Sequence, residues 1–234
     1  MKQLFQDLCT LCLNAILPVR CVVCKQQAPE ALCAQCVAKC APARQRCFVC
    51  RKSSPFGLTH PTCTTRTSPV QSLALFDYAN AAVSESIIMG KYNLIPDVFR
   101  VLGKQCASLH TLAVHTTEYA LCPIPLHPSR LRWRGFNQSA LVATTLAEQW
   151  NVPYTPILRR TKRTTQQKNL NAPARKVNVA DCFQVDPNAP LPAPTTHIVL
   201  IDDVSTTGNT LHQAIRALQA AGFRTISCLC IANE

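Results

Sequence analysis

The sequence predicts an α/β protein, with a parallel sheet flanked by helices and a small cysteine-rich module in front of it. Segments with strand and helix patterns alternate from residue 68 onward. Such alternation is typical of a parallel sheet covered by helices on both faces. The first 67 residues instead carry closely spaced pairs of cysteines. We therefore expect two parts, residues 1–67 and residues 68–234.

Composition indicates a folded chain with an anionic partner. Of 234 residues, 47% are hydrophobic and 15% are charged, which permits a sizeable core and argues against global disorder. Lys and Arg outnumber Asp and Glu by 24 to 12, giving a net charge of +12 that favours a polyanionic or phosphorylated ligand.

No segment is predicted to cross a membrane, since no run approaches the roughly 18 apolar residues of a span. The apolar stretch 4–17 is interrupted by Gln6, Asp7 and Asn14, so it predicts an amphipathic helix rather than a signal peptide. We therefore expect a cytoplasmic protein whose cysteines are reduced.

The cysteine spacing predicts Zn²⁺ at one or two sites. Two Cys-x2-Cys pairs can close a tetrahedral site of four thiolates, and a second unit offers three thiolates and one imidazole. The expected ligands are Cys21, Cys24, Cys33 and Cys36 for the first site, and Cys47, Cys50, His60 and Cys63 for the second. Other cysteines are expected to pack as small apolar residues, with Cys9 and Cys12 on the N-terminal helix and Cys40 beside the first site.

The elements of the main part follow from periodicity. Strands are expected at 70–78, 119–126, 198–201 and 225–232, and helices at 81–89, 98–112, 137–150 and 210–221. The basic stretch 160–177 lacks periodicity and predicts a mobile loop that could close as a lid. The proline-rich stretch 187–194 predicts a surface connection.

Two adjacent carboxylates, Asp202 and Asp203, follow the apolar strand at 198–201. Ligands of parallel sheets bind beyond the carboxyl ends of the strands, where these acids are expected. The hydroxyl-rich turn after them leads into a helix and can cradle one phosphate, but it lacks the lysine of a Walker loop. The combination predicts a site for a ribose 5-phosphate. A plain capped turn is the alternative, and it leaves the paired acids without a purpose.

The charge distribution supports a polyphosphate site. Residues 118–180 contain ten basic and two acidic residues, whereas residues 181–234 contain five acidic and two basic ones. A basic segment facing an acidic strand end is the arrangement expected for a magnesium-bound polyphosphate. A solvated basic face or a track for single-stranded DNA remains the alternative.

The stretch Ile198–Thr210 resembles the 5-phosphoribosyl-1-pyrophosphate (PRPP) motif of type I phosphoribosyltransferases. The resemblance implies that Asp202 and Asp203 bind the ribose hydroxyls. It implies that the 5-phosphate is bound by Ser205, Thr206, Thr207, Gly208, Asn209 and Thr210. Purine-salvage members usually have an aspartate where this chain has Thr206, which argues against hypoxanthine or guanine as the acceptor.

Further stretches resemble the ComF/GntX family, which joins an N-terminal zinc finger to a phosphoribosyltransferase domain. They are Pro123-Ile-Pro-Leu-His-Pro128, Arg130-Leu-Arg-Trp-Arg-Gly-Phe-Asn-Gln138, and Arg160-Thr-Lys-Arg-Thr-Thr-Gln-Gln167 with Arg175 and Asn178. Lys91-Tyr92 stands where the family tends to have a Lys-Phe pair. The chain departs from the family at His60, where a cysteine is common.

A PRPP site must stabilise a leaving pyrophosphate, and no protein nucleophile is required. We therefore expect Mg²⁺ with PRPP, and a turn that contains Pro125 and His127 to present amides to the pyrophosphate. The guanidinium groups of Arg130, Arg132 and Arg134 are expected to clamp its oxygens. The expected catalytic set is Asp202, Asp203, Arg134 and Lys91.

Two functional interpretations remain open. In one, the protein is a metabolic glycosyltransferase that moves phosphoribosyl from PRPP to an unidentified small-molecule acceptor and has no DNA role. In the other, it binds a phosphoribosyl ligand or single-stranded DNA and acts in natural competence, as the resemblance implies, beside competence proteins such as a ComF-type helicase. A purely zinc-mediated scaffold would leave the Asp-Asp motif unexplained.

Overall fold

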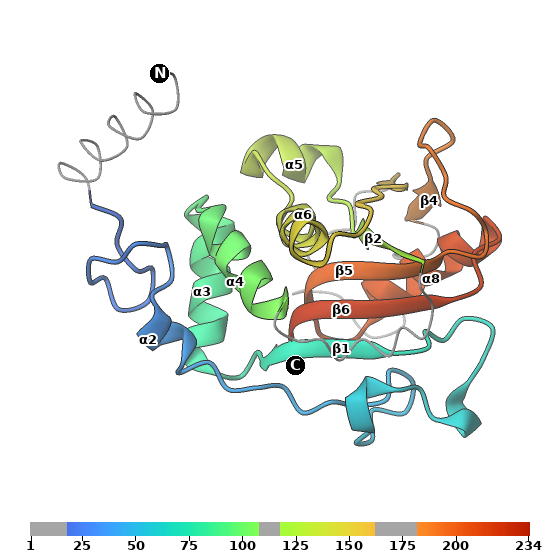
Figure 1. The fold of residues 1–234 in the computed structure, drawn as a ribbon, viewed down its shortest axis with the longest axis horizontal. Coiled ribbons are helices and arrows are strands. Elements are labelled where there is room, and N and C mark those ends of the chain that lie inside the picture. The colour runs from blue at the N-terminus through green and yellow to red at the C-terminus, as the bar shows by residue number, and fades with distance from the viewer. Residues whose placement is uncertain (1–17, 108–117, 162–181) are drawn as a thin grey trace, which may run out of the picture.

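The computed structural model describes residues 18–107, 118–161 and 182–234 (Figure 1). The helix expected at 4–17, with Cys9 and Cys12, lies outside the described residues. So does nearly all of the basic loop expected at 160–177.

A four-stranded parallel sheet forms the centre of the molecule, in the order β1-β6-β5-β2. Its strands are β1 (Ser72–Asp77), β2 (Tyr119–Pro123), β5 (His197–Ser205) and β6 (Ile226–Asn233). A small antiparallel pair, β3 (Leu158–Arg160) and β4 (Phe183–Val185), forms a separate two-stranded sheet. The parallel sheet predicted from the alternation of segments is confirmed.

Helices cover both faces of the sheet (Figure 1). One face is covered by α3, α4 and α6, and the other by α8 together with the β3–β4 pair. The bounds are α3 (Ala81–Tyr92), α4 (Asp97–Ala107), α6 (Gln138–Trp150) and α8 (Asn209–Ala220). Burial on both faces explains the unbroken apolar run in β5, where Val199 and Ile201 face one cluster and Ile198 and Leu200 face the other.

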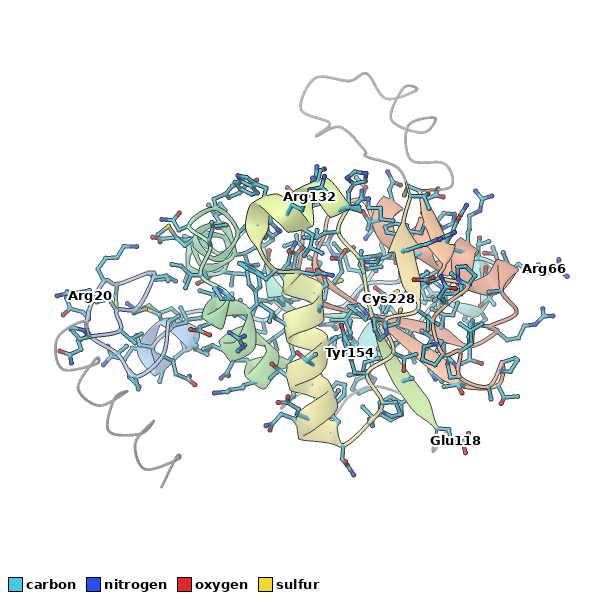
Figure 2. The ribbon with its side chains drawn as sticks, turned by 90° about the horizontal axis from the view of Figure 1, so that it is seen from above. Arg20, Arg66, Glu118, Arg132, Tyr154 and Cys228 are labelled. Atoms are coloured by element: carbon cyan, nitrogen blue, oxygen red, sulfur yellow. The ribbon has the colours of Figure 1, made fainter. Side chains whose placement is uncertain are left out.

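The cysteines of the main part are buried core residues, as expected. They are Cys106, Cys122, Cys182, Cys228 and Cys230. Cys228, labelled in Figure 2, is fully buried and contributes to the cluster beneath α8.

The N-terminal segment wraps around the edge of the sheet. Its first part, with α2 (Ala34–Val37), packs Val22 and Leu32 into the cluster of α3 and α4. The chain then runs antiparallel beside β1, where the Ala43 N–H donates to Leu75 O at 2.9 Å. A second part contains the short 3₁₀ turns η1 (Pro55–Gly57) and η2 (Pro61–Cys63), and it packs Phe48 against the cluster of α8. The segment therefore covers the hydrogen-bonding edge of β1, which would otherwise be open to other chains.

Two element boundaries differ from the sequence predictions near the acids. The last strand but one continues to Ser205, because β6 pairs with it as far as Asn233. The strand expected at 119–126 ends at Pro123, since prolines at 123 and 125 cannot donate to a ladder. A short helix, α5 (Pro128–Arg134), follows it and was not predicted, because its basic residues conceal any apolar periodicity.

Within the described ranges, no helix combines the length and the apolar character that a bilayer crossing requires.

Candidate functional site

A cavity of about 830 Å³ opens at the carboxyl ends of β2 and β5. Six of the predicted site residues line it, namely Lys91, Arg130, Arg134, Asp202, Asp203 and Thr210. They come from α3, α5, β5 and α8, which lie far apart in the sequence. The fold thus gathers the acids and most of the predicted cations around one space.

The two acids lie inside β5 rather than after it. On one side β5 remains paired with β6, where Asp202 is opposite Cys230. On the other side the pairing with β2 ends at Ile201, opposite Pro123. The carboxylates are therefore held on a regular strand, one and two residues past the end of its shorter neighbour.

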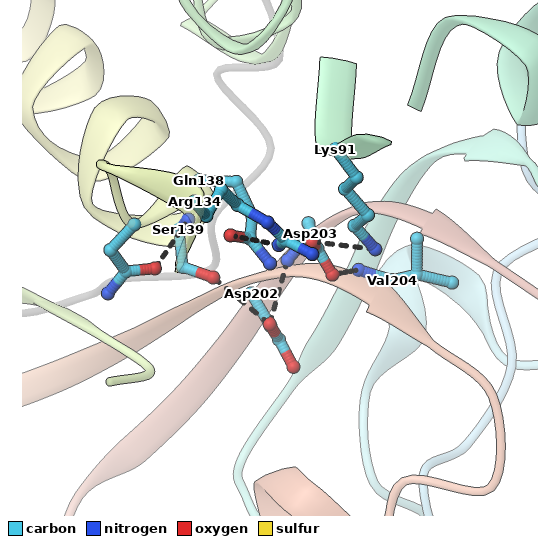
Figure 3. A network of polar contacts seen from close by, with 8 residues as sticks. Lys91, Arg134, Gln138, Ser139, Asp202, Asp203 and Val204 are labelled. Atoms are coloured by element: carbon cyan, nitrogen blue, oxygen red, sulfur yellow. Dashed lines mark hydrogen bonds and ion pairs between the residues drawn. The ribbon is translucent and has the colours of Figure 1, made fainter. Parts of the chain in front are cut away.

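Asp203 is compensated by a lysine from the last turn of α3 (Figure 3). Lys91 Nζ lies 2.8 Å from Asp203 Oδ2, and both side chains are largely buried. The Val204 N–H donates to Asp203 Oδ1 at 2.6 Å. A buried ion pair with an added backbone donor offsets much of the desolvation cost of the carboxylate.

Asp202 is the less compensated of the two carboxylates. Its Oδ1 accepts hydrogen bonds from Ser139 Oγ at 3.1 Å and from the Asp203 N–H at 2.9 Å (Figure 3). Burial, followed by the charge of Asp203, raises the pKa of Asp202 to about 7. A cation or hydroxyl donors placed in the cavity would favour its charged form.

The Arg134–Gln138 motif builds the cavity wall, and each residue has a distinct part in it. Gly135 ends α5 in the left-handed conformation. The Phe136 ring packs against the Phe99 ring, with their centroids 5.9 Å apart. Asn137 caps α6, because its side chain accepts a hydrogen bond from the Ser139 N–H. Arg134 Nη1 donates to Gln138 Oε1 at 2.7 Å (Figure 3). Burial lowers the pKa of Arg134, and the charge of Asp203 opposes that shift.

Arg134 retains an unused donor. Among the described residues, its buried Nε has no hydrogen-bond partner. A buried guanidinium N–H without an acceptor is costly, so an oxygen of a bound ligand would be a favourable partner.

The turn between β5 and α8, residues Thr206–Asn209, is called the phosphate loop from here on. Within the described chain, no protein acceptor engages the amides of Thr206, Thr207 and Gly208. Consecutive unpaired amides before a helix are a ready anion-binding site. Thr210, one residue further on, lines the large cavity, whereas Ser205 is buried at the end of β5.

Of the residues predicted to contact the pyrophosphate, Pro125, His127 and Arg132 do not line the cavity. Pro125 has no N–H, and the neighbouring Ile124 N–H is donated to Ile201 O at 2.9 Å. Leu126, the next residue of the turn, lines the cavity. The His127 imidazole caps α5 through the Ser129 N–H. Arg132 is exposed on α5 (Figure 2).

Other lining residues were not predicted as site residues. They include Tyr92, Trp133, Gln138, Ser139 and Arg160. Tyr92 and Trp133 are 52% and 57% exposed, and their ring centroids are 6.3 Å apart. Arg134 lies over the Trp133 ring at 5.8 Å. An exposed aromatic pair beside guanidinium groups forms part of the cavity mouth.

The predicted metal ligands come together in two groups. Cys21, Cys24, Cys33 and Cys36 form one group, and Cys47, Cys50, His60 and Cys63 the other, with ligand atoms within 4.8 Å of one another in each. A tetrahedral Zn²⁺ with bonds of about 2.3 Å would hold its sulfurs about 3.8 Å apart. The Cys24 and Cys33 sulfurs are 3.8 Å apart. Each group could therefore hold a metal ion.

The first cysteine pair of each group lies in a turn of the same geometry. Lys25 and Arg51 follow the second cysteine of each first pair, and both adopt positive φ, 62° and 61°. Their N–H groups donate to Cys21 O and Cys47 O at 2.9 and 3.0 Å. Burial raises the pKa of Cys21 and of Cys47, but amide hydrogen bonds outweigh it and lower each to about 6. Each turn thus favours one thiolate, which is the form that binds metal.

The fold and this site define a phosphoribosyltransferase-like α/β protein. Residues 137–234 match the family model described as phosphoribosyl transferase domain. The chain is 30% identical over 206 residues to the DNA utilization protein YhgH of Salmonella typhi, covering 82% of this chain and 88% of that protein. On these matches and its resemblance to competence proteins, the chain belongs to the ComF family.

Two competence proteins are among the relatives. Competence protein F of Haemophilus influenzae is 34% identical over 110 residues, which is 46% of this chain and 47% of that protein. Competence protein ComFC of Bacillus subtilis is 28% identical over 153 residues, which is 65% of this chain and 59% of that protein.

The raised pKa of Asp202 predicts a pH-dependent gain in stability for Asp202→Asn. The pKa of Asp202 is 3.8 in the unfolded chain and about 7 in the folded one, so the folded protein holds the proton more tightly. The contribution of this group to the free energy of unfolding therefore falls as the pH rises between these two values. Asparagine keeps the Oδ1 acceptor and removes the charge. The variant should gain about 1–3 kcal/mol in unfolding free energy at pH 8 and little at pH 4.5 by urea denaturation.

Asp97→Asn, at an exposed helix start, is the matched control and should show no such gain. An equal effect of Asp202→Asn at both pH values would contradict the assignment.

Proposed function

We propose that the protein binds PRPP with Mg²⁺ and transfers the phosphoribosyl group to an acceptor. The observation that carries this proposal is one cavity in which a carboxylate pair faces arginines. The phosphate loop follows the acids in the chain, and its first three amides have no protein acceptor among the described residues. These are complementary to the ribose hydroxyls, the pyrophosphate and the 5-phosphate of PRPP, respectively.

Asp202 and Asp203 would accept hydrogen bonds from the ribose hydroxyls, with Lys91 pairing with Asp203 and orienting it. The phosphate loop would bind the 5-phosphate through its amides. Arg130 and Arg134 would bind the pyrophosphate, and the Arg134 Nε would find its acceptor there.

The reaction needs charge stabilisation rather than a protein nucleophile. The bond between the anomeric carbon and pyrophosphate breaks, with the electron pair leaving on pyrophosphate. The acceptor donates a lone pair to the same carbon. Mg²⁺ would neutralise charge on the leaving group when bound. The guanidinium donors act in the same sense, and the buried site strengthens their effect.

We further propose that Zn²⁺ occupies both metal groups of a module spanning residues 1–67, and that the main domain spans 68–234. Thiolate and imidazole ligands in tetrahedral reach suit Zn²⁺. The short chain segment around each metal group buries little apolar surface of its own, so a bound metal would supply much of the local stability.

We propose a role in natural competence in the cytoplasm, with single-stranded DNA as a second ligand. The support is the presence of two competence proteins and a DNA utilization protein among the relatives. The site adds the exposed Tyr92–Trp133 pair, which lies at the same cavity as Arg130 and Arg134 and combines stacking surfaces with positive charge. A ComF-type helicase is a candidate partner. A metabolic transferase without a DNA role is the alternative.

The PRPP proposal predicts loss of binding on changing the acids. Calorimetry should show PRPP binding by the wild type in the presence of Mg²⁺. Asp202→Asn/Asp203→Asn should weaken it roughly 100-fold, because two charge-assisted acceptors of the ribose are lost. Asp97→Asn is the control. Absence of binding by the wild type would sink the proposal.

The DNA proposal predicts that a single-stranded oligonucleotide quenches tryptophan fluorescence through Trp133. The chain has two tryptophans, and the other, Trp150, packs beside α4 with its Nε1 donating to Ala107 O. Quenching should weaken steeply with salt and be abolished in Trp133→Phe. Trp150→Phe should retain it. A response that survives Trp133→Phe would place the DNA elsewhere.

The zinc proposal predicts about two Zn²⁺ per purified chain by elemental analysis. Cys24→Ser and Cys63→Ser should each remove about one. Cys40→Ser is the matched control, since this buried cysteine lies beside the first group without belonging to it, and its content should stay at about two. A wild-type content of about one would eliminate one of the sites.

A further inference from the structure

The phosphate loop is held from outside the large cavity by the second metal knuckle. The second knuckle comprises the turn Cys47–Lys52 and the predicted ligands His60 and Cys63. A second cavity of about 450 Å³ lies between the two, with Thr207, Gly208 and Asn209 on one wall. Phe48 and Arg51 of the knuckle line it as well. The loop is therefore in contact with a part of the chain that the PRPP site itself does not include.

Arg51 makes the direct polar contact with the loop. Its Nη2 donates to Thr206 O at 3.4 Å, and its guanidinium lies 5.7 Å from the centre of the Phe48 ring. The Phe48 side chain packs in turn against the cluster beneath α8. Arg51 is itself exposed, but it is supported by a ring that packs against the core.

Gly208 is where the loop backbone meets this pair most closely. Its φ of +74° belongs to the left-handed region. A Cβ at this position would come within 3.0 Å of Arg51 Nη2 and of Phe48 Cε2. Glycine is therefore favoured at position 208 for two reasons: it adopts the positive φ of the turn, and it leaves room for Arg51 and Phe48 to contact the loop backbone.

The metal group fixes the two residues that reach the loop. Phe48 lies between the ligands Cys47 and Cys50, and Arg51 follows directly after Cys50. Arg51 is held at positive φ by its N–H bond to Cys47 O. An ion bound to Cys47 and Cys50 would close this turn, so the direction of the Arg51 and Phe48 side chains depends on the metal group.

We propose that the second knuckle positions the phosphate loop, so that metal binding there sets the order of the loop and its affinity for a phosphate ester. Arg51 and Phe48 are positioning residues that act through the loop backbone. The part concerning affinity rests on the proposed PRPP function. The part concerning loop order does not, because it follows from the contacts alone.

The test is Arg51→Ala compared with Lys25→Ala, its matched control at the equivalent turn of the first knuckle. Loop order is followed by hydrogen exchange at the His212 amide, which donates to Gly208 O at 2.9 Å and fixes the loop to α8. Arg51→Ala should speed this exchange by about 3–10-fold, and Lys25→Ala should leave it unchanged. Zinc content should remain that of the wild type in both.

The same variants are then titrated with PRPP–Mg²⁺ and, separately, with inorganic phosphate. Arg51→Ala should weaken binding by about 5–10-fold. Cys63→Ser, which removes the second metal, should reproduce both effects, whereas Cys24→Ser at the first metal should reproduce neither.

Unchanged His212 exchange in both Arg51→Ala and Cys63→Ser would overturn the inference. Faster exchange in a protein whose wild type fails to bind PRPP would reject the proposed function and leave the positioning role intact. Equal effects of Cys24→Ser and Cys63→Ser on the exchange would show general destabilisation instead, and would also overturn the inference.

Discussion

Two adjacent carboxylates buried on one strand are the constraint around which the structure is organised. Like charges in a poorly solvated place are unfavourable, so other elements must supply compensation. Lys91 arrives from α3 and Ser139 from the start of α6, and each contacts a different acid. The helices that cover one face of the sheet therefore also provide polar partners for the two carboxylates of the strand beneath them.

These protein groups do not compensate the two carboxylates fully, and a ligand could supply further partners. In the part of the chain that the structure describes, Asp202 has hydroxyl and amide donors but no direct cation, and Arg134 has an unused buried donor at the same cavity. Filling both with protein groups would give a more stable molecule, with fewer polar atoms left for a ligand. The incomplete pairing is consistent with a site that gains favourable partners when a ligand with hydroxyls and phosphates enters.

Local patterns were sufficient to predict the parallel sheet, the Asp202–Asp203 pair and the two groups of metal ligands, because each depends on residues close together in the sequence. The ion pair of Lys91 with Asp203 and the contact of Arg51 with Thr206 could not be derived in that way. The latter joins residues 155 positions apart. Tyr92 and Trp133 were also missed as a pair, because α5 has no periodicity that would indicate which side chains face the cavity.

The order of the strands has a consequence for how the chain is made. β6 follows β1, β2 and β5 in the sequence, yet it lies between β1 and β5 in the sheet. Until it emerges, β1 with its covering N-terminal segment and the β2–β5 pair have no backbone hydrogen bonds to join them. The carboxylate strand would thus remain half-paired until β6 has been synthesised, and the sheet edge that carries the two acids is complete only after that.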